Sequence, residues 1–403
     1  MLTGSSGGET RPTSPEKSRP RLRQGAMETI LRHLDLRRQG VLLVLIVLWL
    51  LFQVTTHGVF LNPRNIAQLL RQASVLGVAA CGMTIIIILG EIDLSIGSAL
   101  YLVGIFAAVL NVWYGWGVIP TLIATLLIGL GIGLWHGIWV ARLGVPAFVV
   151  TLASLMGLRG IGLVISDAAT IYPVAKPYQM ISEGFLAPPL SYVLIGILYL
   201  GFIIFTIRGY RMARSFGVQT DMTWLTAQIV AVGILAAVFA WVTGSFKGIP
   251  TAVIVLFAVA SAIVYLMNNT ILGRNFYAIG SNRDAAALAG IDVRRHLVTA
   301  FLIMGAIYFA SGTLQAARLS GSIAGLGQGL ELDAIAATVI GGTSLMGGVG
   351  TVTGALAGAL LLASVDNGMS LMNVSSFLQL VVKAGLLLAA VWFDVVTRRQ
   401  AGD

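Results

Sequence analysis

The 403-residue sequence has few charged residues, few histidines and a single cysteine. Charged residues make up 10% of the chain, whereas soluble domains carry about 25%. Cys81 cannot form a disulfide within the chain, which excludes a disulfide-stabilised scaffold. The four histidines have no metal-ligand spacing, so we expect no metal site. They are His33, His57, His136 and His296.

The sequence also lacks the signatures of common enzymes. It has no Gly-Lys pair, so it cannot form the glycine-rich phosphate-binding loop that ends in Gly-Lys-Ser/Thr. The dispersed histidines give no Ser/His/Asp or Cys/His constellation. We therefore expect no catalytic residues and no enzymatic activity in this chain alone. A transport role would need a partner or an ion gradient as its source of energy.

Long apolar runs dominate the chain instead. Hydrophobic residues make up 57% of it, and the mean hydropathy is +0.91. This composition predicts an all-α polytopic membrane protein, and its 48 glycines suit close helix packing and broken helices. At roughly 20 apolar residues per crossing, about twelve transmembrane helices are expected, including broken or re-entrant ones. They are expected near 41–52, 66–90, 94–111, 118–141, 147–165, 190–207, 226–243, 249–268, 298–317, 331–346, 351–366 and 377–394.

The net charge of +9 is concentrated in alternate loops. With the N-terminus in the cytoplasm, these loops are cytoplasmic, as the positive-inside rule requires. The charge therefore gives no reason to expect a nucleic-acid partner. Residues 1–38 are predicted to be a disordered basic cytoplasmic tail, 39–397 the transmembrane domain and 398–403 a short cytoplasmic tail. The basic loop residues are Arg142, Arg208, Arg211, Arg214, Arg274, Arg283, Arg294, Arg295, Arg398 and Arg399.

The stretch 90–98 places two carboxylates, Glu91 and Asp93, between two apolar runs. Carboxylates at membrane depth usually face the interior of a bundle or a water-filled path. Gly90 allows the helix to break, and Asp93 and Ser95 can cap the helix that follows. We therefore expect a broken transmembrane helix whose polar joint points inward.

A second glycine-rich stretch, 340–350, also interrupts apolar runs and precedes a helix of small residues. Transporters are often built from repeats whose broken helices meet near the membrane midplane. The two stretches share glycines and hydroxyl groups, so an internal repeat that relates them is a hypothesis.

The longest cytoplasmic loop is expected at about 269–297. Ser281 or Asn282 can cap a short helix there, alanines favour it, and Gly290 can end it. Such a helix would lie at the membrane surface. It is either a docking element or a plain amphipathic connector.

Several motifs in this order resemble those of ABC importer permease subunits of the ribose/xylose branch. The Asp284-Ala285-Ala286 run with Gly290 looks like the family's Glu-Ala-Ala-three-residues-Gly loop, with Asp in place of Glu. The resemblance covers about 40–396, and the two extra segments at 190–207 and 226–243 make the chain most similar to the xylose type. The other matching segments are 91–98, 278–282, 332–337, 339–344 and 364–370.

The resemblance implies a type II-like permease of a bacterial inner membrane, with both termini cytoplasmic. It implies a homodimer embedded in lipid, an ABC ATP-binding subunit and a periplasmic or lipid-anchored sugar-binding protein. The permease would hold no cofactor, because the partner ATPase uses the ATP and magnesium. The substrate implied is xylose. The residues expected to couple to the ATPase are Arg283, Asp284, Ala285, Ala286 and Gly290.

A sugar path needs hydrogen-bonding groups rather than a charged clamp, because sugars carry hydroxyls and no charge. Capping, helix–helix hydrogen bonds or pairing with Arg71, Arg159, Arg318 or Lys383 are alternative roles for the same side chains. The candidate path residues are Glu91, Asp93, Ser95, Asp333, Thr343, Ser344, Asp366 and Asn367.

Two other transport mechanisms compete with an ATP-driven importer. In an ion-coupled secondary transporter, Glu91, Asp93 and Asp366 would bind protons or sodium. The Asp284–Gly290 loop favours the importer, because a secondary transporter needs no ATPase dock. A passive channel is disfavoured, since the sequence shows no ring of repeated charges.

Overall fold

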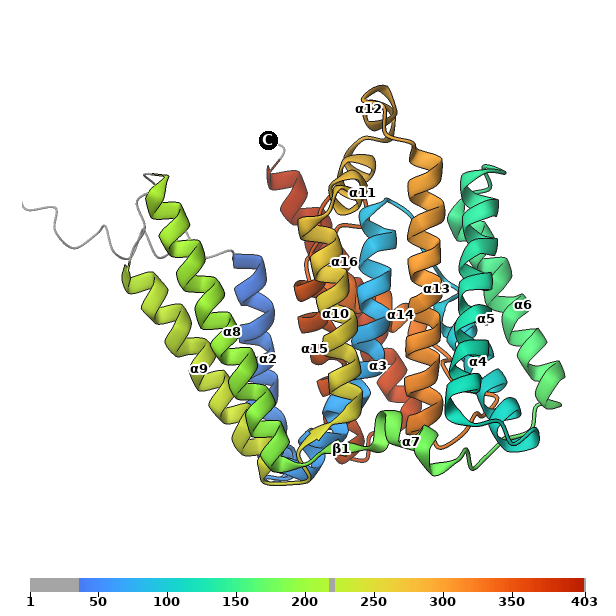
Figure 1. The fold of residues 1–403 in the computed structure, drawn as a ribbon, viewed down its shortest axis with the longest axis horizontal. Coiled ribbons are helices and arrows are strands. Elements are labelled where there is room, and N and C mark those ends of the chain that lie inside the picture. The colour runs from blue at the N-terminus through green and yellow to red at the C-terminus, as the bar shows by residue number, and fades with distance from the viewer. Residues whose placement is uncertain (1–35, 217–221, 402–403) are drawn as a thin grey trace, which may run out of the picture.

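A computed structural model describes residues 36–216 and 222–401, which form a bundle of helices (Figure 1). Most of the tail predicted at 1–38 lies outside the described residues, and its last three residues begin the helix labelled α2. The only sheet in the described part is an antiparallel pair, β1 (Phe185–Leu186) and β2 (Ile249–Pro250). The helices are α2 (Leu36–Thr55), α3 (Pro63–Ile88), α4 (Ile96–Ala108), the π-helical turn η1 (Val109–Trp113), α5 (Val118–Ala141), α6 (Ala147–Ser166), α7 (Lys176–Glu183), α8 (Pro188–Ser215), α9 (Met222–Gly244), α10 (Thr251–Asn269), α11 (Ile271–Ser281), α12 (Arg283–Leu288), α13 (Val293–Arg318), α14 (Leu330–Ile340), α15 (Val352–Leu371) and α16 (Ser376–Ala401).

Each of the twelve expected apolar segments contains a helix, but the helix in the segment expected at 331–346 ends at Ile340, and 341–346 is not helical. Nine helices in the described part are long and apolar enough to cross a bilayer, and shorter apolar stretches lie at Leu43–Thr55 and Ser376–Trp392. The all-α polytopic class predicted from composition is therefore confirmed. The expected short helix in the 269–297 loop is a pair of helices, α11 and α12, that stand above one face of the bundle (Figure 1).

The centre of the bundle is α3, whose residues from Ala73 to Leu89 are nearly all buried. It packs against α10, α13, α14 and α15. Small side chains and glycines in these helices permit the close approach that membrane helices need in the absence of a hydrophobic driving force. The core therefore lies around α3 and α13. Each of these two helices is followed in the chain by a non-helical segment and then by another helix.

Two interruptions precede two short helices. After α3 the chain turns at Gly90 (φ 76°), continues without helix through 91–95 and then forms α4. After α13 it is irregular from 319 to 329 and then forms α14. The glycine-rich stretch at 340–350 separates α14 from α15, and the stretch at 90–98 separates α3 from α4. An internal repeat that relates these two stretches stays a hypothesis.

The two short helices lead to opposite faces of the bundle. The turn η1, which follows α4, approaches the segment before α7, where the Ala175 backbone N–H donates to Asn111 Oδ1 (2.6 Å). The end of α14 returns to the end of α3, where Gly348 N–H donates to the Ile88 carbonyl (2.8 Å). We call the side of the bundle with α7 the α7 face and the side with α12 the α12 face (Figure 1).

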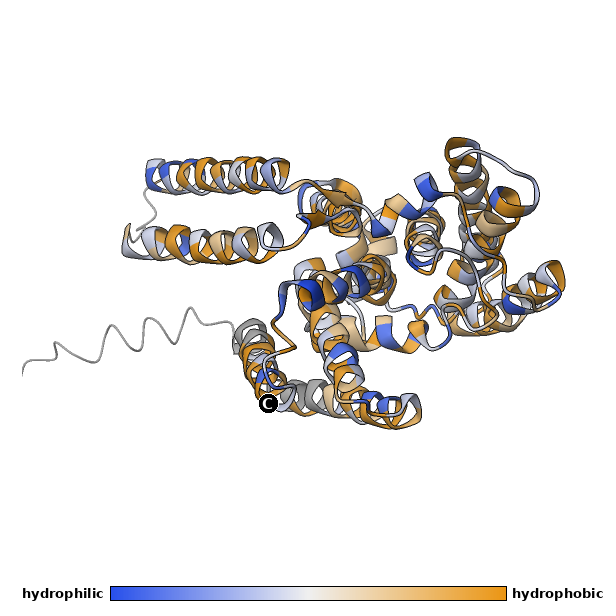
Figure 2. Ribbon diagram, turned by 90° about the horizontal axis from the view of Figure 1, so that it is seen from below, coloured by the Kyte–Doolittle hydropathy of each residue, from blue (hydrophilic) through white to orange (hydrophobic). Residues whose placement is uncertain are grey.

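The α8–α9 pair is set apart from the remaining helices. These two helices pack mainly on each other and project to one side of the bundle, with mostly hydrophobic residues along them (Figure 2). They correspond to the extra segments expected at 190–207 and 226–243.

Candidate functional site

The inward-pointing joint expected at 90–98 is present. Asp93 and Ser95 are fully buried, and Asp93 Oδ1 accepts hydrogen bonds from the Ser95 backbone N–H (2.7 Å) and hydroxyl (2.6 Å). Ser95 occupies the N-cap position of α4, but its side chain makes no capping bond. The expected capping is therefore wrong in detail, because Asp93 accepts its hydrogen bonds from Ser95, the residue before the helix, and not from the first turn of the helix.

The Asp93 carboxylate also links α4 to two other helices. The Tyr308 hydroxyl of α13 donates to Asp93 Oδ2, and His136 Nδ1 of α5 lies 3.2 Å from that hydroxyl. All three side chains are fully buried, and His136 Nε2 has no hydrogen-bond partner within the described residues. Because a buried carboxylate is costly unless hydrogen bonds satisfy it, this chain of contacts holds the joint in place.

Sequence reasoning missed Tyr308 and His136. The spacing of the histidines indicates no metal site, and spacing alone does not reveal other contacts of a histidine. The available signal was that His136 is the only titratable side chain in the apolar run 118–141. A lone polar side chain at membrane depth needs a partner, although the sequence does not identify it.

The N-terminal ends of the two short helices meet inside the bundle. A Cβ atom on Gly97 of α4 would lie 2.4 Å from the Gly327 carbonyl oxygen and 2.2 Å from Glu331 Oε2, so only glycine fits there. Arg159 of α6 stabilises the same irregular segment by donating to the carbonyls of Ala324 (3.0 Å) and Leu326 (2.8 Å). Helix N-termini that converge at midplane are a feature of transporter binding sites.

The coupling segment contacts the joint directly. Arg283, the first residue of α12, forms an ion pair with Glu91 (2.5 Å), so residues from the two predicted sets lie together. A Cβ on Gly280 of α11 would lie 1.7 Å from the Ile88 carbonyl oxygen, which shows how closely α11 packs on the end of α3. A hollow of about 520 Å³ beside this contact is lined by residues 89–91, 140, 144–147 and 279–283.

Helix α12 presents an open surface. Asn282 caps it by accepting the Ala285 N–H (2.9 Å), and Gly290 (φ 84°) ends it, as expected. Ala286 is buried beneath the helix, whereas Asp284 and Ala285 are exposed. Leu288, which the sequence analysis did not single out, is 90% exposed.

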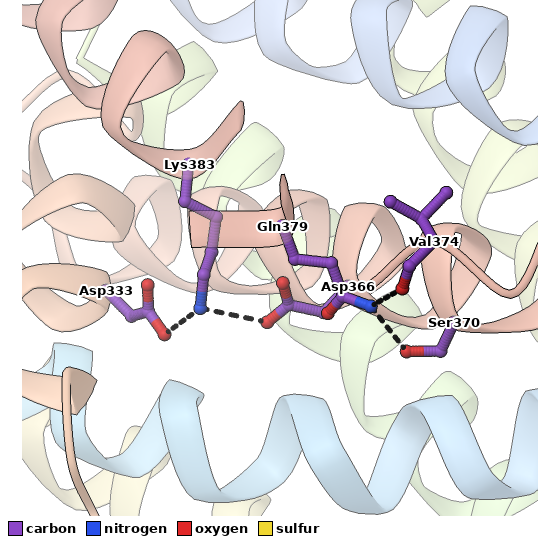
Figure 3. Close-up of polar contacts among 6 residues, drawn as sticks. All are labelled: Asp333, Asp366, Ser370, Val374, Gln379 and Lys383. Carbon is purple, nitrogen blue, oxygen red and sulfur yellow. Dashed lines mark hydrogen bonds and ion pairs between the residues drawn. The ribbon is translucent and has the colours of Figure 1, made fainter. Parts of the chain in front are cut away.

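Asp333 and Asp366 lie elsewhere and are paired. Lys383 of α16 forms ion pairs with Asp333 of α14 (2.8 Å) and Asp366 of α15 (3.5 Å), and the three side chains lie between their helices (Figure 3). They remain 18–32% exposed. The structure therefore shows these carboxylates paired with Lys383, which is one of the alternative roles given for them above.

The remaining candidates make local contacts. Asn367 exchanges hydrogen bonds with Asn65 of α3 (2.8 and 3.1 Å), which joins α15 to α3. The Ser344 hydroxyl accepts the Met346 N–H (3.1 Å) within the 341–351 loop. The Thr343 hydroxyl is buried, and no hydrogen-bond partner for it lies in the described part of the chain. Within the described residues, none of these three side chains forms a hydrogen bond with Asp93 or with Asp333.

The fold and its interrupted helices define a multi-pass membrane translocation protein. The chain matches the family described as "Branched-chain amino acid transport system / permease component" over residues 65–391, and it belongs to this family. It is thus an ABC importer permease subunit, which works with a separate ATP-binding subunit and a substrate-binding protein and is not itself an enzyme.

Three curated relatives show which permeases the chain resembles. The chain is 40% identical to the xylose transport system permease protein of Haemophilus influenzae, over 92% of this chain and 99% of that protein. It is 38% identical to the xylose transport system permease protein of Escherichia coli, over 92% and 95%. It is 32% identical to the ribose import permease protein of Escherichia coli, over 89% and 94%. No solved structure matches the chain.

Proposed function

We propose that this chain is the permease subunit of an ATP-driven, binding-protein-dependent xylose importer. The observation that carries the mechanism is the Arg283–Glu91 ion pair, which connects the exposed helix α12 to the interrupted helix after α3. Similarity to xylose permeases over more than nine-tenths of the chain supports the substrate. Selectivity can reside in the binding protein, so the permease needs only weak contacts with the sugar.

We place the α12 face in the cytoplasm of a bacterial cell and the α7 face on the periplasmic side of the inner membrane. Arg142, Arg274, Arg294 and Arg295 support this orientation, because they lie in loops or helix ends on the side of α12. Both chain ends are then cytoplasmic. ATP and magnesium are used by the partner ATPase, and the permease carries no cofactor of its own.

Helix α12 would dock into a groove of the ATPase through Asp284, Ala285 and Leu288, all exposed. Movement of α12 would reach the joint by two routes. One is the Arg283–Glu91 ion pair, and the other is the contact between Gly280 and the end of α3. Asp93 and Ser95 would then shift with the start of α4, changing how the two short helices meet.

We propose that the permease works as a homodimer. The Lys383–Asp333–Asp366 group supports this, because partly exposed charges at membrane depth do not face lipid. They would line either a water-filled path or the surface of a second copy. The same group weakens the alternative of an ion-coupled transporter. Asp366, one of the carboxylates expected to bind the ion, is already paired with Lys383.

The experiment is co-purification of the tagged chain with its native neighbours, followed by ATPase assays with xylose-loaded binding protein. We expect an ATPase subunit to bind and xylose to stimulate its activity. Asp284→Arg should lose both, whereas Asp284→Glu, which carries the family's usual residue, should retain them.

Two results would contradict this function. One is an Asp284→Arg variant whose ATPase activity is still stimulated by xylose. The other is a chain that purifies alone and transports xylose into liposomes under a proton gradient.

A further inference from the structure

The α8–α9 hairpin is a conspicuous surface of the described fold without protein cover. In each helix only 6% of the most apolar window is buried inside the bundle. Lipid tails are as apolar as these side chains, so they can cover the hairpin at membrane depth. The polar end of the hairpin, toward the α12 face, is a different kind of surface (Figure 1).

A hollow of about 570 Å³ lies at that end, between the last turns of α8 and the first turns of α9. One wall is formed by Tyr210, Arg211 and Arg214 of α8. The other wall, formed by α9, is mostly apolar: it consists of Met222, Leu225 and Ile229, with one hydroxyl group from Thr226. The hollow therefore combines positive charge and a phenol with an apolar side that continues into the lipid-facing surface of the hairpin.

The positive charge is not neutralised by described protein groups. Arg208 precedes Arg211 by one turn of α8, and all three arginines are exposed. None of them pairs with a carboxylate in the ranges 36–216 and 222–401. The helices α8 and α9 contain no Asp or Glu, and Asp221, which lies between them in sequence, is outside the described residues.

Arginine suits a phosphate, because its planar guanidinium donates two parallel hydrogen bonds to phosphate oxygens. A neutral sugar does not require this charge. A soluble nucleotide does not require the apolar wall of α9. A molecule with a phosphate and hydrocarbon chains uses both walls at once, and basic pockets between membrane helices bind such headgroups.

We propose that this hollow binds the headgroup of an anionic phospholipid from the leaflet at the α12 face. Arg211 and Arg214 contact the phosphate, Arg208 adds to the local positive potential, and the acyl chains lie along α8 and α9. The lipid supplies the packing that the rest of the chain does not give to the hairpin. This site is independent of the identity of the transported sugar.

The test is native mass spectrometry of the full-length permease in detergent, titrated separately with dioleoylphosphatidylglycerol and dioleoylphosphatidylcholine. We expect preferential retention of the phosphatidylglycerol. Each arginine near an anionic lipid contributes about fivefold in affinity, so Arg211→Gln/Arg214→Gln should weaken binding roughly 25-fold. Arg142→Gln/Arg294→Gln, which removes two exposed arginines elsewhere on the α12 face, should bind as the wild type does.

A charge-conserving variant separates charge from folding. Arg211→Lys/Arg214→Lys should retain preference for phosphatidylglycerol, because lysine also binds phosphate as a point charge. The proposal is overturned if both lipids are retained equally or if the Gln pair binds like the wild type. It is also overturned if a co-purifying protein occupies the hollow instead.

Discussion

Arg283 and Glu91 are 192 positions apart in the chain, yet their side chains form an ion pair of 2.5 Å. Arg283 begins the surface helix α12, and Glu91 begins the non-helical entry to α4. The Arg283 side chain is 47% exposed and Glu91 only 13%. The pair therefore joins a partner-accessible element to a buried one, and it is the first contact to test.

We predict that Glu91→Gln and Arg283→Gln each reduce xylose-stimulated ATPase activity severalfold and that the double variant is no worse than either one. The contribution of such a half-exposed pair to stability is about 0.2–1 kcal/mol, so folding should change little. A double-mutant cycle on stimulated ATPase activity and on the thermal midpoint measures both effects. Strictly additive losses would show that the two residues act separately.

Leu288→Ser should weaken the association of the ATPase subunit without affecting the fold. Burying a leucine stabilises a complex by about 1.5–3 kcal/mol, which corresponds to roughly 12- to 140-fold in affinity. Since Leu288 is 90% exposed in the chain alone, the thermal midpoint should not change. Met212→Ser, at an exposed position near the end of α8, is the matched control and should bind the ATPase normally. Normal binding by Leu288→Ser would contradict the docking role of α12.

Gly280→Ala should destabilise the contact between α11 and α3. The added methyl group would lie 1.7 Å from a backbone oxygen that has little freedom to move. Overpacking of this kind costs typically 1–3 kcal/mol. Gly131→Ala in α5, where an added Cβ meets nothing within 4 Å, should be neutral or slightly stabilising. Thermal unfolding of both variants in the same detergent tests this prediction. Equal midpoints would mean that the contact between α11 and α3 is loose enough to accept the methyl group.

Lys383→Met should be more harmful than loss of an ordinary surface lysine. The change leaves Asp333 and Asp366 without their cation. Because the group is partly exposed, we expect the free energy of unfolding to fall by roughly 1–3 kcal/mol, which is less than for a fully buried pair. A second change in the same variant, Asp333→Asn, should restore part of the lost stability. Lys176→Met, at an exposed lysine without an ion pair in the described part, is the control. A Lys383→Met variant as stable as the control would show that solvent already screens the group.

The sequence predicted the helices well, because an apolar run long enough to cross a membrane has few alternatives to helix. It also predicted the break at Gly90 and the ends of α12 at Asn282 and Gly290, which depend on local chemistry. What it could not predict were partners far apart in the chain. Nothing near Asp93 points to Tyr308, 215 positions away.

The candidate residues illustrate the same limit. The sequence grouped Asp366 and Asn367 because they are neighbours, but successive positions on a helix point in different directions. Asp366 therefore faces Lys383, whereas Asn367 faces Asn65 on α3.

The contact between Gly97 and Gly327 has a consequence for access to the membrane interior. From this point α4 leads toward the α7 face and α14 toward the α12 face. Because the two short helices share one anchor, a displacement that loosens the packing of one also displaces the other. We therefore expect that opening toward the α7 face and opening toward the α12 face exclude each other. A leak open to both compartments at once would require this anchor to separate.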